Sequence, residues 1–209
     1  MYKVENAKKK KLFEEIHLHL LEDQRPSEYL STILLEPLFS EYPFSMIKNL
    51  TKAEQSPVHH PEGNAWKHTL LVVDEAARRR KDSKEGEVFM WAALLHDIGK
   101  PVTTRVRKGK ITSYDHDRVG AKMSKEFLSF FSCEENFIEK VSALVRYHMH
   151  ILYIVKDLSF GNIKDMKENT DVNELALLGL CDRLGRLKPD REIEEENIKL
   201  FLNKVQNRR

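Results

Sequence analysis

The stretch AALLHDIGKP, Ala92 to Pro101, places a histidine and an aspartate directly after an unbroken apolar run. Apolar residues surround the helix that this run predicts, so His96 and Asp97 should reach the interior at its end. Burying an unpaired ionisable group is costly. Because imidazole and carboxylate are ligand types for a divalent transition metal, a shared cation is one chemistry that would justify the burial.

Two further segments aim ionisable side chains at an apolar helix face. In FIEKVSALVRYHMH the apolar stripe continues at His148. His150 lies about 200° away on the helical wheel and is expected to face outward. In NELALLGLCDRLGR, Asp182 falls on the face that Leu175 and Leu178 define. A carboxylate in the core needs a cation or several hydrogen-bond donors.

Each of these residues has an ordinary structural interpretation when it is taken alone. An inward histidine is usually hydrogen-bonded in the core, and an inward aspartate usually pairs with an arginine or caps a helix. Taken together they favour a metal site, because one cation would compensate all of them. The predicted ligands are His68, His96, Asp97 and Asp182, with His116 and His148 as further ligands.

Helices must position these residues, because glycine and proline are sparse, at 8 and 7, and most segments repeat apolar residues at helical spacing. The expected fold is all-α, with one small β-hairpin over TTRVRKGKITSY that turns at Lys108-Gly109. The expected helices cover about 8–23, 65–79, 86–97, 117–131, 135–150, 173–184 and 192–205, with shorter helical pieces before residue 49.

Particular residues define the expected helix ends. Asn64 and Asp117 should each cap a helix N-terminus, and Pro26 should end the first helix. Gly99 and Pro101 should end the helix that carries the HD dipeptide, which would leave an opening beside the ligands.

Length, charge and cysteine content limit the class of protein. Residues 1–55 are expected to form a helical lead-in packed on a main domain of residues 56–209. The net charge of +2 predicts no strong general attraction to nucleic acid. Two cysteines without a CxxC motif suit a reducing compartment. No apolar signal core or segment of about 20 apolar residues is present, so we expect a cytoplasmic protein without a membrane partner.

The motifs resemble a known family. The order H, HD, D, at His68, His96-Asp97 and Asp182, is similar to that of the HD superfamily of metal-dependent phosphohydrolases, and LLHDIGKP is close to its central signature. The resemblance covers about Val58 to Arg186. More narrowly, HHPEGNAWKHTLLVVDEAA, YDHDRVGAKMS and VRYHMH resemble the HD domain attached to bacterial tRNA nucleotidyltransferases. Because no nucleotidyltransferase head with paired aspartates is found, CCA addition to tRNA is not expected.

This resemblance implies an HD-domain helical bundle with a metal at its centre. The implied activity is hydrolysis of phosphate esters such as nucleotides, 2′,3′-cyclic phosphates or the ends of RNA. His116 and His148 match the extra histidines of HD proteins that hold two metals. The expected cofactor is one or two divalent ions of Fe, Mn, Ni, Co or Zn, or of Mg.

The expected mechanism uses water activated by the metal. A divalent ion lowers the pKa of a bound water to about 7 and polarises the phosphoryl oxygen. If two ions lie about 3.5 to 4 Å apart, Asp97 is expected to bridge them. One ion would then be held by His68, His96 and Asp182, and the other by His116 and His148. With one ion, the last two histidines would support the ligands or the substrate.

Several charged residues could serve the substrate. Lys100 follows the ligands, and its ammonium is expected to neutralise a phosphate, so Asp97 and Lys100 are the predicted catalytic residues. The alternative for Lys100 is a solvated lysine near a helix C-terminus. Arg146 and Arg118 are candidates of the same kind, and Glu62 lies in a loop that could line the pocket mouth.

Two other classes of protein stay open at this point. One is a non-catalytic nucleotide- or RNA-binding module with a structural metal, for which a closed coordination shell would speak. The other is a plain helical scaffold, whose stability chelators would leave unchanged. The substrate, the native metal and the oligomeric state do not follow from the sequence.

Overall fold

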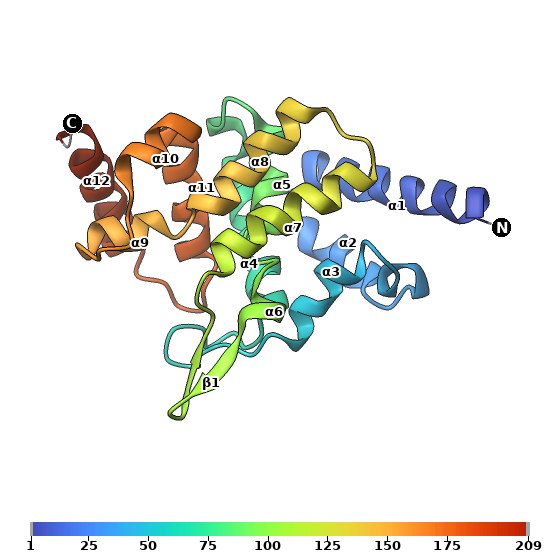
Figure 1. Cartoon of the computed structure of the whole chain (residues 1–209), viewed down its shortest axis with the longest axis horizontal. Helices are drawn as coiled ribbons and strands as arrows, with labels where there is room; N and C mark the ends of the chain where they lie inside the picture. The colour runs from blue at the N-terminus through green and yellow to red at the C-terminus, as the bar shows by residue number, and fades with distance from the viewer. Residues whose placement is uncertain (1, 208–209) are drawn as a thin grey trace.

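Helices make up most of the chain, which the computed structural model describes over residues 2–207. The expected all-α fold with a single hairpin is confirmed among these residues (Figure 1). The helices are α1 (Tyr2–Glu22), α2 (Pro26–Ile33), α3 (Ser45–Lys48), α4 (Ala65–Arg79), α5 (Gly86–Leu95), α6 (Lys100–Thr103), α7 (His116–Phe130), α8 (Glu135–Tyr147), α9 (His150–Val155), α10 (Ile163–Asn169), α11 (Val172–Leu184) and α12 (Arg191–Asn207). Short 3-10 turns cover Pro37–Ser40, Asn49–Lys52 and Arg80–Asp82.

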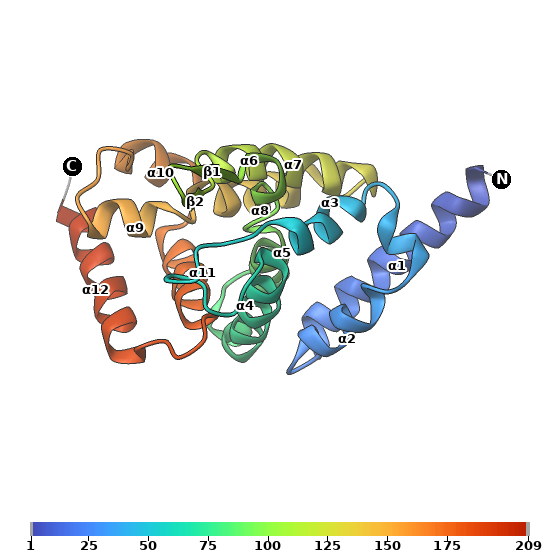
Figure 2. The same cartoon turned by 90° about the horizontal axis from the view of Figure 1, so that it is seen from below.

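Helix α5 is the centre of the bundle. All its residues from Val88 to Leu95 are buried, as expected of a helix that is apolar on every side. It packs against α1, α4, α8 and α11. Figure 2 shows α7 and α8 as one layer of the molecule, with α4, α5 and α11 beneath it and α1 and α12 at opposite ends. The end of α5 therefore opens into the middle of the molecule.

Helix α1 contributes aromatic and imidazole rings to this core. Phe13 of α1 stacks on Trp91 of α5 with ring centroids 4.7 Å apart, and on Phe131 at 4.3 Å. The indole Nε1 of Trp91 donates a hydrogen bond to Nδ1 of His17, 3.1 Å away. The buried indole is therefore covered and hydrogen-bonded by the first helix of the chain.

The hairpin is confirmed at its expected place. β1 (Arg105–Arg107) pairs antiparallel with β2 (Lys110–Thr112), with Val106 opposite Ile111. Lys108 and Gly109 both have positive φ, at 50° and 75°, which matches the twist of a two-residue hairpin turn. Figure 1 shows it projecting away from the helices. No described helix has the length and apolar character that a bilayer crossing requires.

Some predicted helix ends are confirmed and others are wrong. Asn64 caps α4 by accepting a hydrogen bond from the backbone N–H of Lys67, as predicted. Asp117 is not a cap: α7 begins at His116, and the Asp117 carboxylate instead accepts from Arg146 at 2.7 Å. Pro26 begins α2, because proline is tolerated in a first helical turn.

The helix expected over 135–150 is broken. α8 ends at Tyr147 and α9 starts at His150, so one helical wheel does not apply to both. His150, expected to face outward, is buried, with its ring 5.0 Å from that of Tyr147. The first helix also begins earlier than expected, at Tyr2, and α10 lies in a segment for which no helix was predicted.

Gly99 lies in the turn that joins α5 to α6. The helix has already ended at Leu95, and Pro101 stands in the first turn of α6, so the expected role of these two residues as helix breakers was wrong. A Cβ on Gly99 would lie 2.2 Å from the carbonyl oxygen of His116 and 2.7 Å from the backbone nitrogen of Gly120. The turn therefore packs directly on the backbone of α7, which brings two predicted ligand segments together.

We predict that Gly99→Ala lowers the free energy of unfolding by about 1–3 kcal/mol, since overpacking against rigid backbone forces the segments apart. Urea denaturation measures the change. The matched control is Gly86→Ala, where a Cβ would meet the flexible side chain of Arg80 at 3.2 Å and its carbonyl oxygen at an ordinary contact distance of 3.5 Å. That variant should be neutral or gain up to about 1 kcal/mol. Equal stability of the two variants would contradict the close approach.

Candidate metal centre

Three histidines are oriented in the same way. Each ring places Nδ1 within hydrogen-bond distance of the carbonyl oxygen three residues before it, which can only accept. Nδ1 therefore carries the proton, and a neutral ring leaves a free lone pair on Nε2. The pairs are His96 with Ala93 at 2.8 Å, His116 with Ser113 at 2.7 Å and His148 with Val145 at 2.7 Å.

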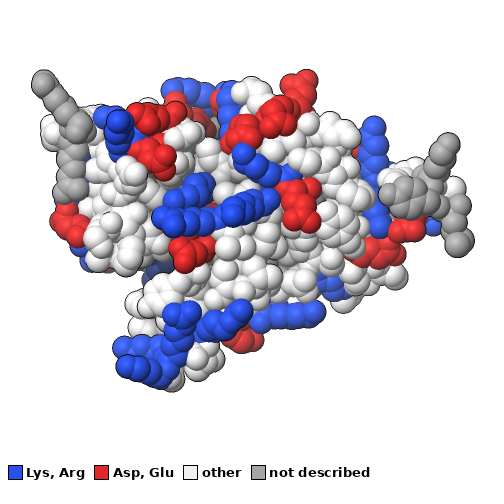
Figure 3. All heavy atoms as spheres, in the orientation of Figure 1, with Lys and Arg blue, Asp and Glu red and all other residues white. Residues whose placement is uncertain are grey.

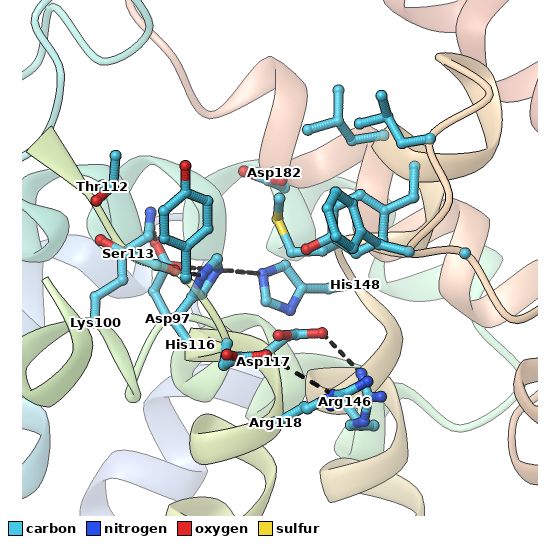
Figure 4. A pocket seen from close by; sticks show the side chains of 18 of the residues that line it. Asp97, Lys100, Thr112, Ser113, His116, Asp117, Arg118, Arg146, His148 and Asp182 are labelled. Carbon is cyan, nitrogen blue, oxygen red and sulfur yellow. Dashed lines mark hydrogen bonds and ion pairs between the residues drawn. The ribbon is translucent and has the colours of Figure 1, made fainter. Parts of the chain in front are cut away.

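Two of these lone pairs face each other. Nε2 of His116, at the start of α7, lies 3.2 Å from Nε2 of His148, which directly follows α8 (Figure 4). Burial lowers the pKa of both histidines, that of His148 to about 4, so both rings are neutral near pH 7. Neither Nε2 can then donate to the other. Asp97 completes the group, with Oδ1 3.5 Å from the first nitrogen and 3.9 Å from the second.

A second group adjoins the first. Nε2 of His68 lies 2.9 Å from Oδ1 of Asp182, and donor atoms of these two residues and of His96 lie within 4.8 Å of one another. Nε2 of His96 is buried without a hydrogen-bond partner among the described residues. The ring centroids of His96 and His148 are only 5.5 Å apart, which connects the two groups. The centre thus combines an imidazole nitrogen without a partner, two lone pairs that face each other, and two carboxylates. This set of donors fits a divalent cation.

The structure also shows how the carboxylates are charged. Burial alone would raise the pKa of Asp97, but nearby positive charge, including the Lys100 ammonium 2.6 Å away, holds it well below its usual range. Burial likewise opposes ionisation of Asp182, and the hydrogen bond with His68 outweighs it and lowers the pKa. Both side chains are therefore anionic and available to a cation.

Lys100 is buried rather than solvated, so the alternative of a solvated lysine was wrong. Its Nζ lies 2.6 Å from Oδ2 of Asp97 and donates to Oε1 of Gln55 at 2.5 Å. The ammonium thus lies at the carboxylate that joins the two groups. Its expected contact with a phosphate stays a prediction.

Glu62 lies behind His68 rather than on the wall of the cleft. Its Oε1 is 3.0 Å from Nδ1 of His68 and 2.8 Å from Nδ1 of His60. Burial would raise the pKa of Glu62, but the hydrogen bonds from the two histidines outweigh it and lower the pKa to about 2. The anion holds the His68 ring so that Nε2 faces Asp182, as carboxylates behind metal-bound histidines do. His60, Glu62 and His68 also form a third potential ligand group.

A cleft of about 1780 Å³ reaches this centre, and Asp97, His116, His148 and Asp182 line it. Its walls come from the hairpin, the segment between α9 and α10, and the end of α11. Of the predicted substrate residues, Lys100, Arg146 and Arg118 line it, whereas Glu62 does not (Figure 4). Arg118 is exposed, 4.0 Å from Asp115. In the space-filling view, Lys and Arg side chains gather on the hairpin and near the middle of the same face (Figure 3).

Two cleft residues were missed from the sequence. Arg183 and Arg186 line the cleft beside Asp182. The signal was present in CDRLGR, where an arginine directly follows the inward aspartate and a second lies just past the helix end.

The family comparison decides the class of the chain. A model of the HD domain matches residues 65–187. The chain belongs to the HD domain family. All six predicted ligands of this HD domain lie inside the match, whereas Glu62 and the lead-in lie outside it.

The chain is also similar to parts of larger bacterial proteins. It is 31% identical over 116 residues to a multifunctional CCA protein of Actinobacillus pleuropneumoniae, covering 56% of this chain and 26% of that protein. It is 29% identical over 172 residues to the multifunctional CCA protein of Methylococcus capsulatus, covering 80% of this chain and 34% of that protein. It is 32% identical over 111 residues to the CC-adding tRNA nucleotidyltransferase of Thermus thermophilus, covering 48% of this chain and 23% of that protein. The chain thus spans only about a quarter to a third of each relative.

Proposed function

We propose that this HD domain is a metal-dependent phosphohydrolase that cleaves a phosphate ester of a nucleotide or of a nucleic-acid end. The observation that carries the proposal is the pair of neutral imidazoles whose Nε2 atoms face each other at 3.2 Å beside the Asp97 carboxylate. Such an arrangement lacks an internal donor, and a cation would satisfy both nitrogens.

The proposed ligands are His68, His96, Asp97 and Asp182, with His116 and His148 supporting one ion or holding a second. Mixed imidazole and carboxylate donors suit Fe, Mn, Co, Ni or Zn better than Mg, which prefers oxygen ligands. When bound, the ion would supply Lewis acidity and a water whose pKa is lowered to about 7.

The chain's own residues would orient and neutralise the substrate. Carbonyl oxygens hold the histidine rings in one tautomer, so no reorganisation precedes binding. The ammonium of Lys100, 2.6 Å from Oδ2 of Asp97, lies where it can neutralise a phosphate oxygen and donate a proton to a leaving oxygen.

The open cleft supports an enzyme over a structural metal site. Structural sites surround their ion, whereas catalytic sites keep an open position. Four of the six proposed ligands line a cleft of about 1780 Å³. The similarity to a multifunctional CCA protein and to a CC-adding tRNA nucleotidyltransferase supports a nucleotide or RNA end as the substrate class.

Metal analysis and a phosphatase screen test the proposal. Purified protein should contain about one or two divalent ions, and with added Mn, Co, Ni or Mg it should hydrolyse members of a panel of 2′-, 3′- and 5′-nucleotides and 2′,3′-cyclic nucleotides. Chelator-treated protein is the control. Protein without metal that releases no product from any panel member in any of these ions would refute the proposed function.

A further inference from the structure

Arg183 and Arg186 form a pair of cationic side chains without a counter-ion. Both line the cleft, and each is half-buried. Within the described part of the chain, neither guanidinium makes a hydrogen bond or has a carboxylate within 4.0 Å. Nε of Arg186 is fully buried and without a hydrogen-bond partner. Arginines held in this way are suited to bind an anion, since burial of an unpaired charge is costly and guanidinium groups pair strongly with anionic oxygens.

The nearby carboxylates do not fill this role. Asp182 and Glu194 act on Arg183 only through space. Asp182 already pairs with His68 at 2.9 Å, and a metal ion on its carboxylate would cancel its charge. The two guanidiniums therefore leave this wall of the cleft with a surplus of positive charge.

The backbone fixes where the pair lies. Gly185 separates Arg186 from the end of α11, and a Cβ at this position would lie 2.9 Å from the backbone Cα and nitrogen of Val72. The Gly185 carbonyl oxygen also lies 3.2 Å from Nδ1 of His68. The turn is thus packed on α4 and connected to a proposed ligand, so Arg186 is held beside the metal centre.

We propose that Arg183 and Arg186 form a subsite for a phosphate group of the substrate that is not itself hydrolysed. This inference rests on the proposed function. Guanidinium groups match phosphate oxygens through paired N–H donors. The cleft of about 1780 Å³ exceeds the roughly 300–1,000 Å³ of a usual small-ligand pocket and has room for a second phosphate. The ligand class is a nucleotide with two phosphate groups, either free or at the end of an oligonucleotide.

A binding experiment without metal tests the subsite independently of catalysis. Chelator-treated protein is titrated with inorganic phosphate and followed by calorimetry. Arg183→Gln and Arg186→Gln should each weaken binding about tenfold, because each removes a charged hydrogen-bond donor. The lysine variants keep the positive charge but lose the paired N–H donors of the guanidinium, so their phosphate affinity should lie between those of the unsubstituted protein and the glutamine variants. Arg191→Gln is the matched control, since Arg191 is exposed on α12 and pairs with Glu195.

A kinetic experiment then tests the substrate class. With metal, a nucleoside 3′,5′-bisphosphate should have a lower KM than the corresponding monophosphate. The glutamine variants should remove this difference by raising the KM of the bisphosphate about tenfold, with kcat nearly unchanged.

The two experiments separate the subsite from the proposed function. If no ester is hydrolysed but phosphate binding depends on the arginines, the proposed function fails and the anion site stands. If both glutamine variants bind inorganic phosphate as the unsubstituted protein does, or if that protein binds none, the subsite is refuted. A lowered melting temperature with unchanged phosphate affinity would show instead that the arginines act as charges at the α11 C-terminus.

Discussion

Replacing Asp97 by asparagine is expected to abolish metal retention and to lower kcat/KM by more than about 100-fold, because even residues that only support metal ligands cost 10–100-fold. The carboxylate is fully buried and lies within 3.9 Å of nitrogens on His96, His116 and His148. Asparagine keeps its shape but removes the charge that compensates a cation and Lys100. Mass spectrometry of bound metal and steady-state kinetics measure the two effects.

A second buried aspartate supplies the control. Asp74 lies outside the cleft, where its carboxylate accepts hydrogen bonds from the backbone and hydroxyl of Ser27 at 3.0 and 2.7 Å. Asp74→Asn should lower the melting temperature but leave metal content and kcat/KM unchanged. If Asp97→Asn is folded by circular dichroism and retains its full metal content, Asp97 is not a ligand.

Metal addition should strongly stabilise the chelator-treated protein. An ion at a concentration 1,000 times its Kd contributes about 4 kcal/mol, and each kcal/mol raises the Tm of a chain of this size by about 2–4 °C. We therefore expect a Tm increase of about 8–16 °C with a well-bound ion. Scanning calorimetry with and without Mn, Co, Ni or Zn measures it. The proposed ligands lie on α4, α7 and α11 or directly after α5 and α8, so the ion would hold distant parts of the chain together.

Histidine variants locate this effect. His148→Gln removes one of the facing nitrogens and should reduce the Tm increase at a fixed metal concentration. His19→Gln should leave it unchanged, because His19 lies on α1 and pairs with Asp23 at 2.8 Å. A chain whose Tm is the same with metal and with chelator would be the plain helical scaffold that the sequence left open.

The sequence predicted which histidines and aspartates lie close together better than it predicted the contacts of the residues around them. His96 and His148 could be placed inward because each continues an apolar helix face, and both are buried in the folded chain, whereas Asp182 is only partly buried. The partners of Asp117 and Lys100 could not be predicted. Both depend on contacts between segments distant in the sequence, with Arg146 in one case and Gln55 in the other.

Helix ends were less predictable for a related reason. Local preferences suggested that Gly99 and Pro101 stop a helix, but the tight approach of α7 gives Gly99 another role. His150 was misplaced because nothing local indicated the break between α8 and α9. The missing ion-pair partners of Arg183 and Arg186 could not be predicted from the sequence, because they follow from how each side chain is buried in the folded chain.

The stacking of Phe13 on Trp91 determines how far the chain can be shortened at its N-terminus. A fragment that starts at residue 56 keeps every proposed ligand but loses the ring that covers the indole and the imidazole of His17 that accepts its hydrogen bond. The indole, about one turn before the end of α5 at Leu95, would then meet water. An exposed aromatic surface of this kind promotes self-association. The first helix therefore keeps water from this part of the core, and we expect that a shortened chain has to include it to keep the fold.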